Sequence, residues 1–258
     1  ALQLSVRQAF KHGLEYDFNY TLAKSLDEGS DPERTVGGSV IINSFAPHQW
    51  YAPSDFDVRH NITANYTAPL PFGRGQLINI HSRVLDAILG GYQINGLVHY
   101  SSGFPFSAVG AGNWGLNFAY NSNMVATGKI PTGGHHYDKV DQVETALNGI
   151  TSADAHANLR FAYVGESGER NNYRADGYFS VDDGLAKTFR TFREQQIRIS
   201  VEAFNIINTN RFNSSAYAGA GSPLQTDGTS ANFGTYIGGQ NALLLQPRQM
   251  QFSAKYIF

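Results

Sequence analysis

Apolar and polar side chains alternate at every second position in several segments of this chain of 258 residues. The clearest segment runs from Leu14 to Leu22, where each even position carries a large apolar or aromatic side chain and each odd position a polar one. Successive side chains of a β-strand point to opposite faces, whereas a helix would distribute these residues around its axis. The alternation therefore predicts strands that have one apolar face and one polar face.

The same alternation recurs along the whole chain and predicts seven strands. They are expected at about 1–10, 14–22, 61–70, 92–101, 178–189, 197–203 and 250–258. About 10 residues at ~3.4 Å per residue, tilted by ~45°, span about 25 Å, which is the height of the apolar band of an outer-membrane barrel.

The connections between these strands alternate in length. Tight turns are expected at 11–13 and 191–194, and a medium connection at 72–91 with a helical turn around 84–89. The other three connections are long and rich in Gly, Asn, Ser and Asp, and they cover about 26–58, 110–177 and 214–243. Short turns at one end and long loops at the other are typical of outer-membrane barrels.

A soluble β-sandwich would show the same alternation, because it hides one face of each sheet in a core. Three observations favour a barrel whose apolar face meets lipid. The polar positions carry mainly Asn, Gln, Thr and Ser, as expected of a wet interior, and aromatic residues lie near the ends of the segments. The last alternating segment also stops on an apolar aromatic residue, Phe258, at a terminus that would fray in a soluble protein.

Composition narrows the classes of function. Charged residues make up 16% of the chain, below the roughly 25% of soluble domains, and no apolar run approaches the ~18 residues of a transmembrane helix. A net charge of −2 gives no electrostatic support to nucleic-acid binding. There is no Cys and no G-x-S-x-G or H-E-x-x-H motif, so we expect neither an enzyme nor a cofactor.

Seven short motifs resemble, in the same order, the C-terminal barrel of TonB-dependent outer-membrane receptors. The most similar group is the Oar-like one, whose proteins carry a carboxypeptidase-regulatory-like domain at the N-terminus. The motifs are SDFDVRHN (54–61), PLPFGRG (69–75), LGGYQING (89–96), SGFPF (102–106), GERN (168–171) with Arg174, EAFNIIN (202–208) and PRQMQF (247–252).

The resemblance implies a 22-stranded barrel of which this chain holds about the last seven strands, so that the sheet alone would be open and curved. It also implies an N-terminal plug that contacts the TonB complex, an unknown extracellular ligand, and a wall embedded in outer-membrane lipid. Tyr256 and Phe258 match the family's C-terminal strand pattern, which the barrel-assembly machinery reads.

Asp183 departs from the family pattern, which has an apolar residue on the outward face at this position. A carboxylate that faces lipid is costly at mid-depth and less costly near the interface. We therefore expect Asp183 to lie near a rim of the barrel, or a bulge to change the facing of the strand there.

Aromatic residues in the longest connection are candidates for ligand contact. Trp114, Phe118 and Tyr120 can stack on a sugar or a siderophore, or they can form a small cluster that folds the loop on itself.

Two further sets of polar residues are weaker candidates. His135, His136 and Asp138 offer imidazole and carboxylate ligands to a metal, although adjacent histidines on an extended chain converge poorly on one ion, and a solvated loop is the alternative. Arg198 and Glu202 fall on the polar face of one strand, where they can contact a plug or form charge pairs with neighbouring strands.

Three functions follow from these observations. The first is ligand capture by extracellular loops and TonB-energised uptake by the full-length receptor. The second keeps the barrel without transport and uses it for surface display or adhesion. The third is a secreted β-sandwich that binds glycans through loop aromatics. The first two place the protein in the outer membrane.

Overall fold

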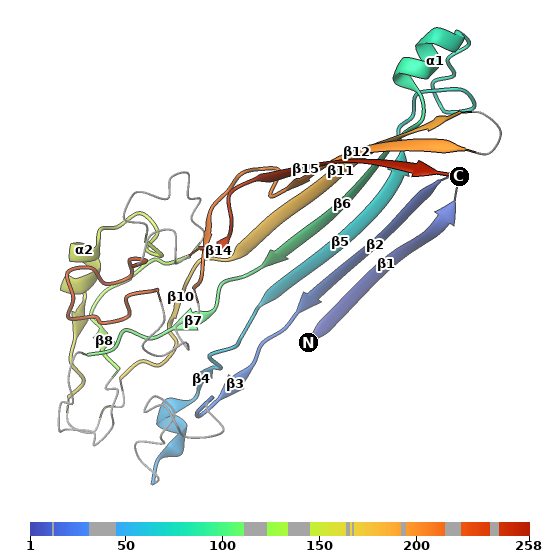
Figure 1. Ribbon diagram of the computed structural model, residues 1–258. Helices are drawn as coiled ribbons and strands as arrows, with labels where there is room; N and C mark the ends of the chain where they lie inside the picture. The colour runs from blue at the N-terminus through green and yellow to red at the C-terminus, as the bar shows by residue number, and fades with distance from the viewer. Residues whose placement is uncertain are drawn as a thin grey trace.

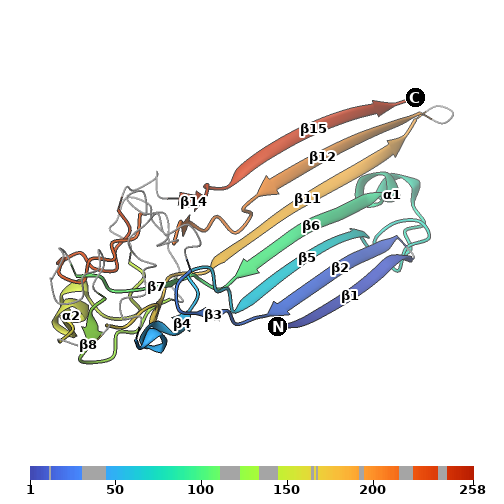
Figure 2. The ribbon, with the colours of Figure 1, turned by 90° about the horizontal axis from the view of Figure 1, so that it is seen from below.

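Seven antiparallel strands form one open, curved sheet in the computed structural model (Figures 1 and 2). The structure describes residues 1–11, 13–30, 45–110, 123–133, 145–163, 166, 168–191, 195–214, 223–237 and 243–258. In sheet order the strands are β1 (Leu2–Lys11), β2 (Leu14–Leu22), β5 (His60–Pro69), β6 (Tyr92–Ser101), β11 (Tyr178–Arg190), β12 (Gln196–Phe204) and β15 (Gln249–Ile257). Each expected strand is confirmed to within about one residue at either end.

The pairing register converts the alternation of the sequence into two distinct faces. Phe18 pairs with Ala64, which pairs with Val98, and these side chains share what we call the apolar face. One residue along, Asn19 pairs with Thr63 on the opposite, polar face. A one-residue slip would exchange the faces, so the continuous register keeps the apolar side chains together.

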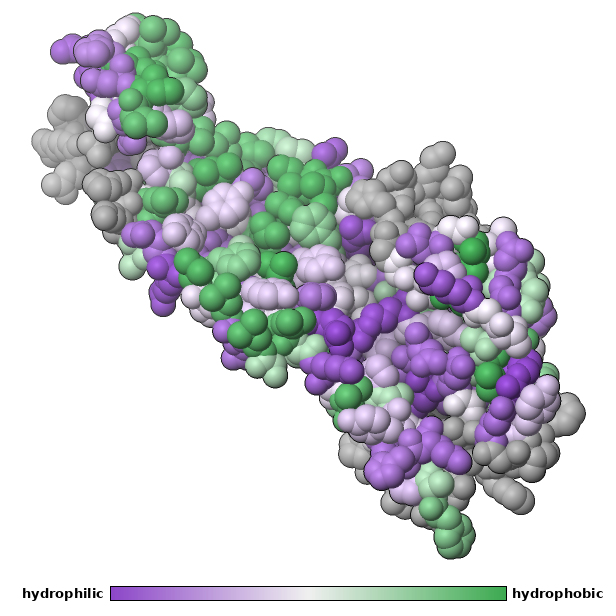
Figure 3. Space-filling model, turned by 180° about the vertical axis from the view of Figure 1, so that it is seen from behind, coloured by the Kyte–Doolittle hydropathy of each residue, from purple (hydrophilic) through white to green (hydrophobic). Residues whose placement is uncertain are grey.

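No second sheet of the described chain covers the apolar face. Leu4 at one edge is 51% exposed, and Phe252 at the other edge is 73% exposed. In Figure 3 hydrophobic residues gather over the strands, whereas hydrophilic residues dominate the end of the molecule where the long connections lie. The arrangement excludes the β-sandwich considered above, because a sandwich would bury this face against a partner sheet.

The long connections all lie at one end of the sheet and the short ones at the other (Figures 1 and 2). The short end carries the helix α1 (Arg83–Leu89), which confirms the helical turn predicted there. The long end carries β3 (Leu26–Asp27), η1 (Pro47–Trp50), β4 (Ala52–Pro53), β7 (Pro105–Phe106), β8 (Val125–Ala126), α2 (Ser152–Ala157), β9 (Leu159–Arg160), β10 (Tyr173–Arg174), β13 (Arg211–Phe212) and β14 (Leu243–Leu245). None of the described helices is long and apolar enough to cross a membrane.

The buried hydrophobic core lies among the long connections and not beneath the sheet. We call the described residues of 23–30, 45–59, 102–177 and 205–248 the loop module. Its core draws on residues far apart in the sequence: Phe106, Ala108, Met124, Ile130, Ala146, Leu147, Ala155, Tyr173, Ala175, Phe212, Leu224, Phe233 and Tyr236. Phe106 and Phe233 are fully buried, with ring centroids 6.1 Å apart. The long connections are therefore a folded unit and not separate solvated loops.

Asp183 occupies the apolar face without a bulge and away from a strand end. The register of β11 runs unbroken through Asp183, which pairs with Gly96 in the middle of β6. The expectation of a rim position or a bulge is therefore wrong. Tyr66 of β5 reaches across β6 instead, and its hydroxyl donates a hydrogen bond of 3.1 Å to Oδ2 of Asp183.

Gly96 makes this long-range contact possible. A Cβ at position 96 would lie 2.4 Å from Cζ of Tyr66, so only a glycine lets the tyrosine ring lie flat over the strand. The ring covers the backbone of β6 and carries its hydroxyl to the carboxyl group. The polar side chain is thus satisfied within the apolar face, as a group removed from water requires.

We expect the Tyr66→Phe substitution to lower the free energy of unfolding by about 1–3 kcal/mol, because it leaves Oδ2 of Asp183 without its donor, whereas Oδ1 keeps the hydrogen bond from the backbone nitrogen of Gly184. In an Asp183→Ala background the same substitution should cost less than about 0.5 kcal/mol, since both partners are then apolar. Urea titration of the protein in lipid vesicles measures both costs. Equal costs in the two backgrounds would contradict the coupling.

Candidate functional site

A tight turn in the second long connection presents the polar side chains that organise the loop module. Gly168 has a φ of 73°, and a Cβ there would lie 2.0 Å from the carbonyl oxygen of Asn123. Asn171 also adopts a left-handed φ, of 53°, which asparagine tolerates better than most residues. The GERN motif therefore forms a compact turn from which Arg170 and Asn171 reach into the first long connection.

Arg170 is the centre of this contact, and its side chain is only 4% exposed. Its Nη1 donates to Oδ1 of Asp27 at 2.7 Å and to the carbonyl oxygen of Trp50 at 3.3 Å. Its Nη2 donates to Oγ of Ser30 at 2.6 Å and to Oδ1 of Asp55 at 3.3 Å. One buried guanidinium thus joins four points of the first connection, and its charge is balanced by two carboxylates.

Asn171 and Arg174 extend the same contact along the chain. Nδ2 of Asn171 donates to the carbonyl oxygen of Pro53 at 2.8 Å. Arg174 donates to the carboxylate of Asp57 and, at 2.9 Å, to the carbonyl oxygen of Gly103. Two motifs more than 100 residues apart, SDFD (54–57) and GERN with Arg174, therefore bind each other. Their contact was not predicted, although both motifs were already singled out by the resemblance.

The charge state of Asp27 depends on these neighbours. Burial opposes ionisation of its carboxyl group, but hydrogen bonds from Ser54, Ser30 and Arg170 outweigh burial and lower its pKa below the ordinary value of 3.8. A lowered pKa in the folded state means that the stabilisation is present above the unfolded-state pKa and is lost as the pH falls through the folded value. The contribution of Asp27 to this contact is therefore fully present at neutral pH and is lost only as the pH falls below the ordinary carboxyl pKa.

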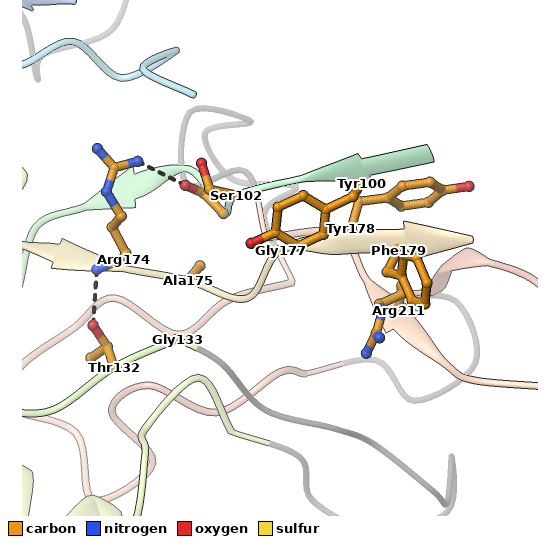
Figure 4. A pocket seen from close by; sticks show the side chains of 11 residues that line it. Tyr100, Ser102, Thr132, Gly133, Arg174, Ala175, Gly177, Tyr178, Phe179 and Arg211 are labelled. Atoms are coloured by element: carbon orange, nitrogen blue, oxygen red, sulfur yellow. Dashed lines mark hydrogen bonds between the residues drawn. The ribbon is translucent and has the colours of Figure 1, made fainter. Parts of the chain in front are cut away.

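A cavity of about 660 Å³ lies where the loop module meets the ends of β6 and β11 (Figure 4). It is lined by Tyr100, Ser102, Gly103, Thr132, Gly133, Arg174, Ala175, Gly177, Tyr178, Phe179 and Arg211. Oγ1 of Thr132 accepts a hydrogen bond from the backbone nitrogen of Arg174 at 2.9 Å, which fixes the floor of the cavity (Figure 4). The lining combines aromatic rings with guanidinium groups and has neither a carboxylate nor an imidazole.

This chemistry is suited to binding a ligand. Aromatic faces contact apolar or planar groups, and hydroxyl and guanidinium groups donate hydrogen bonds. The cavity and the Arg170 contact meet at Arg174, so a ligand in the cavity would touch the same residues that join the connections.

The residues predicted to contact a ligand or a metal cannot be placed. Trp114, Phe118 and Tyr120 lie outside the described residues. His135, His136 and Asp138 lie outside them as well. Within the described part of the chain, no group of three or more His, Asp and Glu side chains gathers closely enough to hold a metal ion.

Arg198 and Glu202 lie on the polar face of β12, as predicted. Arg198 pairs with Thr188 and Lys255, and Glu202 pairs with Gly184 and Gln251. Among the described residues neither side chain forms an ion pair, so the charge pair with neighbouring strands is not seen there. Both side chains can therefore contact another part of the protein that lies against the polar face.

Comparison with known proteins gives one match. A family model described as an outer membrane beta barrel domain matches residues 1–251. No curated protein and no solved structure matches the chain.

We expect Arg170→Gln to open the contact between the first two long connections. The substitution leaves Asp27 and Asp55 without their cation, and loss of one partner of a buried ion pair costs about 3–5 kcal/mol. Trp50, which is 2% exposed, reports the opening. In a Trp114→Phe background, which leaves Trp50 as the single tryptophan, its emission should shift to longer wavelength.

Arg160→Gln is the matched control. Arg160 pairs with Glu166 in the same connection at 2.7 Å and does not touch the first one in the contacts described. Its removal should leave the emission of Trp50 unchanged. The same shift in both variants, or no shift in either, would contradict the central role of Arg170.

Proposed function

The chain belongs to the outer membrane beta barrel domain family. We propose that it forms part of the wall and part of the extracellular surface of a receptor, and that this receptor imports its ligand with energy from TonB. Membership places the protein in the outer membrane. In this proposal the apolar face is the surface that meets lipid. We further propose that the loop module lies outside the cell and that the turn end with α1 lies in the periplasm.

The packed loop module is the observation that supports a receptor most directly. Connections that served only to join strands would not need a shared hydrophobic core or a buried Arg170. A rigid platform at the mouth of a barrel is suited to recognition, because fixed side chains lose less conformational entropy on binding. The cavity beside Arg174 gives this platform a recess at the junction with the wall.

Transport also requires a domain that occludes the barrel and responds to TonB. The motifs listed above resemble TonB-dependent receptors, and in this proposal such a plug belongs to the complete protein. Arg198 and Glu202 face the polar side of the wall and would contact the plug. Among the strands that the structure describes, β1 pairs only with β2, and β15 only with β12, so further strands would complete a closed barrel of about 22 strands.

The end of β15 supports an assembly role within the same proposal. Tyr256 is 53% exposed and Phe258 is 97% exposed, and their ring centroids lie 6.1 Å apart. Two exposed aromatic rings at the end of an edge strand form a surface that the barrel-assembly machinery would read during insertion. This role belongs to outer-membrane barrels in general and does not depend on transport.

The complete receptor, purified in detergent and mixed with the purified periplasmic domain of TonB, tests the transport proposal. We expect saturable binding by calorimetry, and loss of binding when the plug is deleted. Absence of binding in the complete protein would contradict TonB-dependent uptake. It would favour the alternative of a surface-display or adhesion barrel, which uses the same loop module without a transport cycle.

A further inference from the structure

Helix α1 presents an apolar side to its surroundings. Val84, Leu85, Ile88 and Leu89 fall within an arc of about 140° on a helix with ~100° per residue, and Arg83 and Asp86 lie on the other side. These four apolar side chains are 69%, 52%, 57% and 49% exposed, and no residue of α1 is buried. A helix in water would not keep such a side uncovered, because each side chain gains about 1.5–3 kcal/mol on full burial.

Lys187 fixes α1 on the apolar side of the sheet. Lys187 pairs with Tyr92 and Ile199, so it projects from the apolar face of β11. Its Nζ donates to the carbonyl oxygens of Ala87 and Ile88 at 2.6 and 2.7 Å, in the last turn of the helix. The same Nζ lies 4.3 Å from the ring centroid of Tyr92, and the side chain is buried.

This contact satisfies both partners. The last carbonyl groups of a helix carry a partial negative charge and need donors, and a cation near them is favourable. An ammonium on a lipid-facing surface would otherwise be costly. The helix and the lysine therefore neutralise each other at the turn end of the wall.

We propose that α1 is an interfacial anchor that lies in the headgroup region of the phospholipid leaflet at the turn end of the sheet. Val84, Leu85, Ile88 and Leu89 would insert between the acyl chains, and Arg83 would remain at the level of the phosphates. Amphipathic helices bind membrane surfaces in this manner. The inference goes beyond the proposed function, and it depends on the membrane location of the barrel and not on transport.

The apolar side of α1 is continuous with the lipid-facing surface of the sheet. This continuity favours lipid, and not another protein, as the partner that covers the helix. In Figure 3 the hydrophobic residues of α1 at one corner of the molecule continue into those over the adjoining strands. A helix attached through Lys187 to the face that meets hydrocarbon lies next to that hydrocarbon. A periplasmic protein or a second copy of the chain would have to displace the lipid that already borders this face.

These 258 residues contain no Cys, so a cysteine introduced at one position is unique within them. We would attach a nitroxide to Ile88→Cys and, on the other side of α1, to Arg83→Cys in the complete protein. Phe252→Cys on the apolar face reports lipid independently. Vesicles of phosphatidylethanolamine and phosphatidylglycerol are the probe. Accessibility to oxygen, which enters hydrocarbon, is compared with accessibility to a nickel chelate, which stays in water.

If α1 is an interfacial anchor, the accessibility of the label to oxygen should exceed its accessibility to the nickel chelate at least twofold at positions 88 and 252. At position 83 the accessibility to the nickel chelate should be the greater one. A label at position 88 that is more accessible to the nickel chelate, together with a label at position 252 that is more accessible to oxygen, would contradict the proposed anchor. It would not contradict the membrane location of the barrel. An immobilised label at position 88 that neither reagent reaches would also overturn the anchor, since a protein would then cover the helix.

Lys187→Met tests the attachment of the helix. Methionine keeps an apolar chain of similar length but removes the donors to Ala87 and Ile88. The label at position 88 should gain mobility, while the label at position 252 should be unchanged. An unaltered spectrum at position 88 would show that the lysine does not hold α1 against the wall.

Discussion

A chain in a bilayer must satisfy every backbone amide and carbonyl group internally, because hydrocarbon offers no hydrogen-bond partners. The continuous antiparallel ladder from β1 to β15 meets this constraint for its five central strands. It also explains why the side chains alternate, since one side of the same ladder meets lipid and the other meets water. The two outer strands each have one neighbour in the described chain, which is why we propose that further strands close the barrel.

A similar constraint accounts for the contacts of two charged side chains on the apolar face, Asp183 and Lys187. Asp183 receives a hydrogen bond from Tyr66 across Gly96, and Lys187 donates to the last carbonyl groups of α1. Neither group is left unpaired, although the two solutions differ. The first is internal to the sheet, and the second recruits a helix from a neighbouring connection. At the long end of the sheet the polar groups are satisfied in another way, through the buried Arg170 and the carboxylates around it.

Strand positions could be predicted from the sequence because period-two alternation is a local property, and the seven strands agree with it to within about one residue. The alternation of short and long connections along the chain predicted that the long ones lie together at one end of the sheet. The contact of Arg170 with Asp27 and Asp55 could not be predicted, because it joins residues separated by 143 and 115 positions and no local pattern encodes it. Asp183 was misjudged for a similar reason: its partner Tyr66 lies 117 residues away. The chemistry of the ligand is carried by side chains of the loop module and is independent of the strand pattern.

The central claim is that hydrocarbon covers the apolar face, and two neighbouring residues of β5 test it most directly. Ala64 lies on the apolar face, opposite Phe18 and Val98, whereas Thr63 lies on the polar face, opposite Asn19 and His99. Urea unfolding in phospholipid vesicles should show that Ala64→Lys costs about 2–4 kcal/mol and that Thr63→Lys costs less than about 1 kcal/mol, because a lysine is expensive only where it meets lipid. Equal costs at the two positions, or a larger cost at Thr63, would contradict the account.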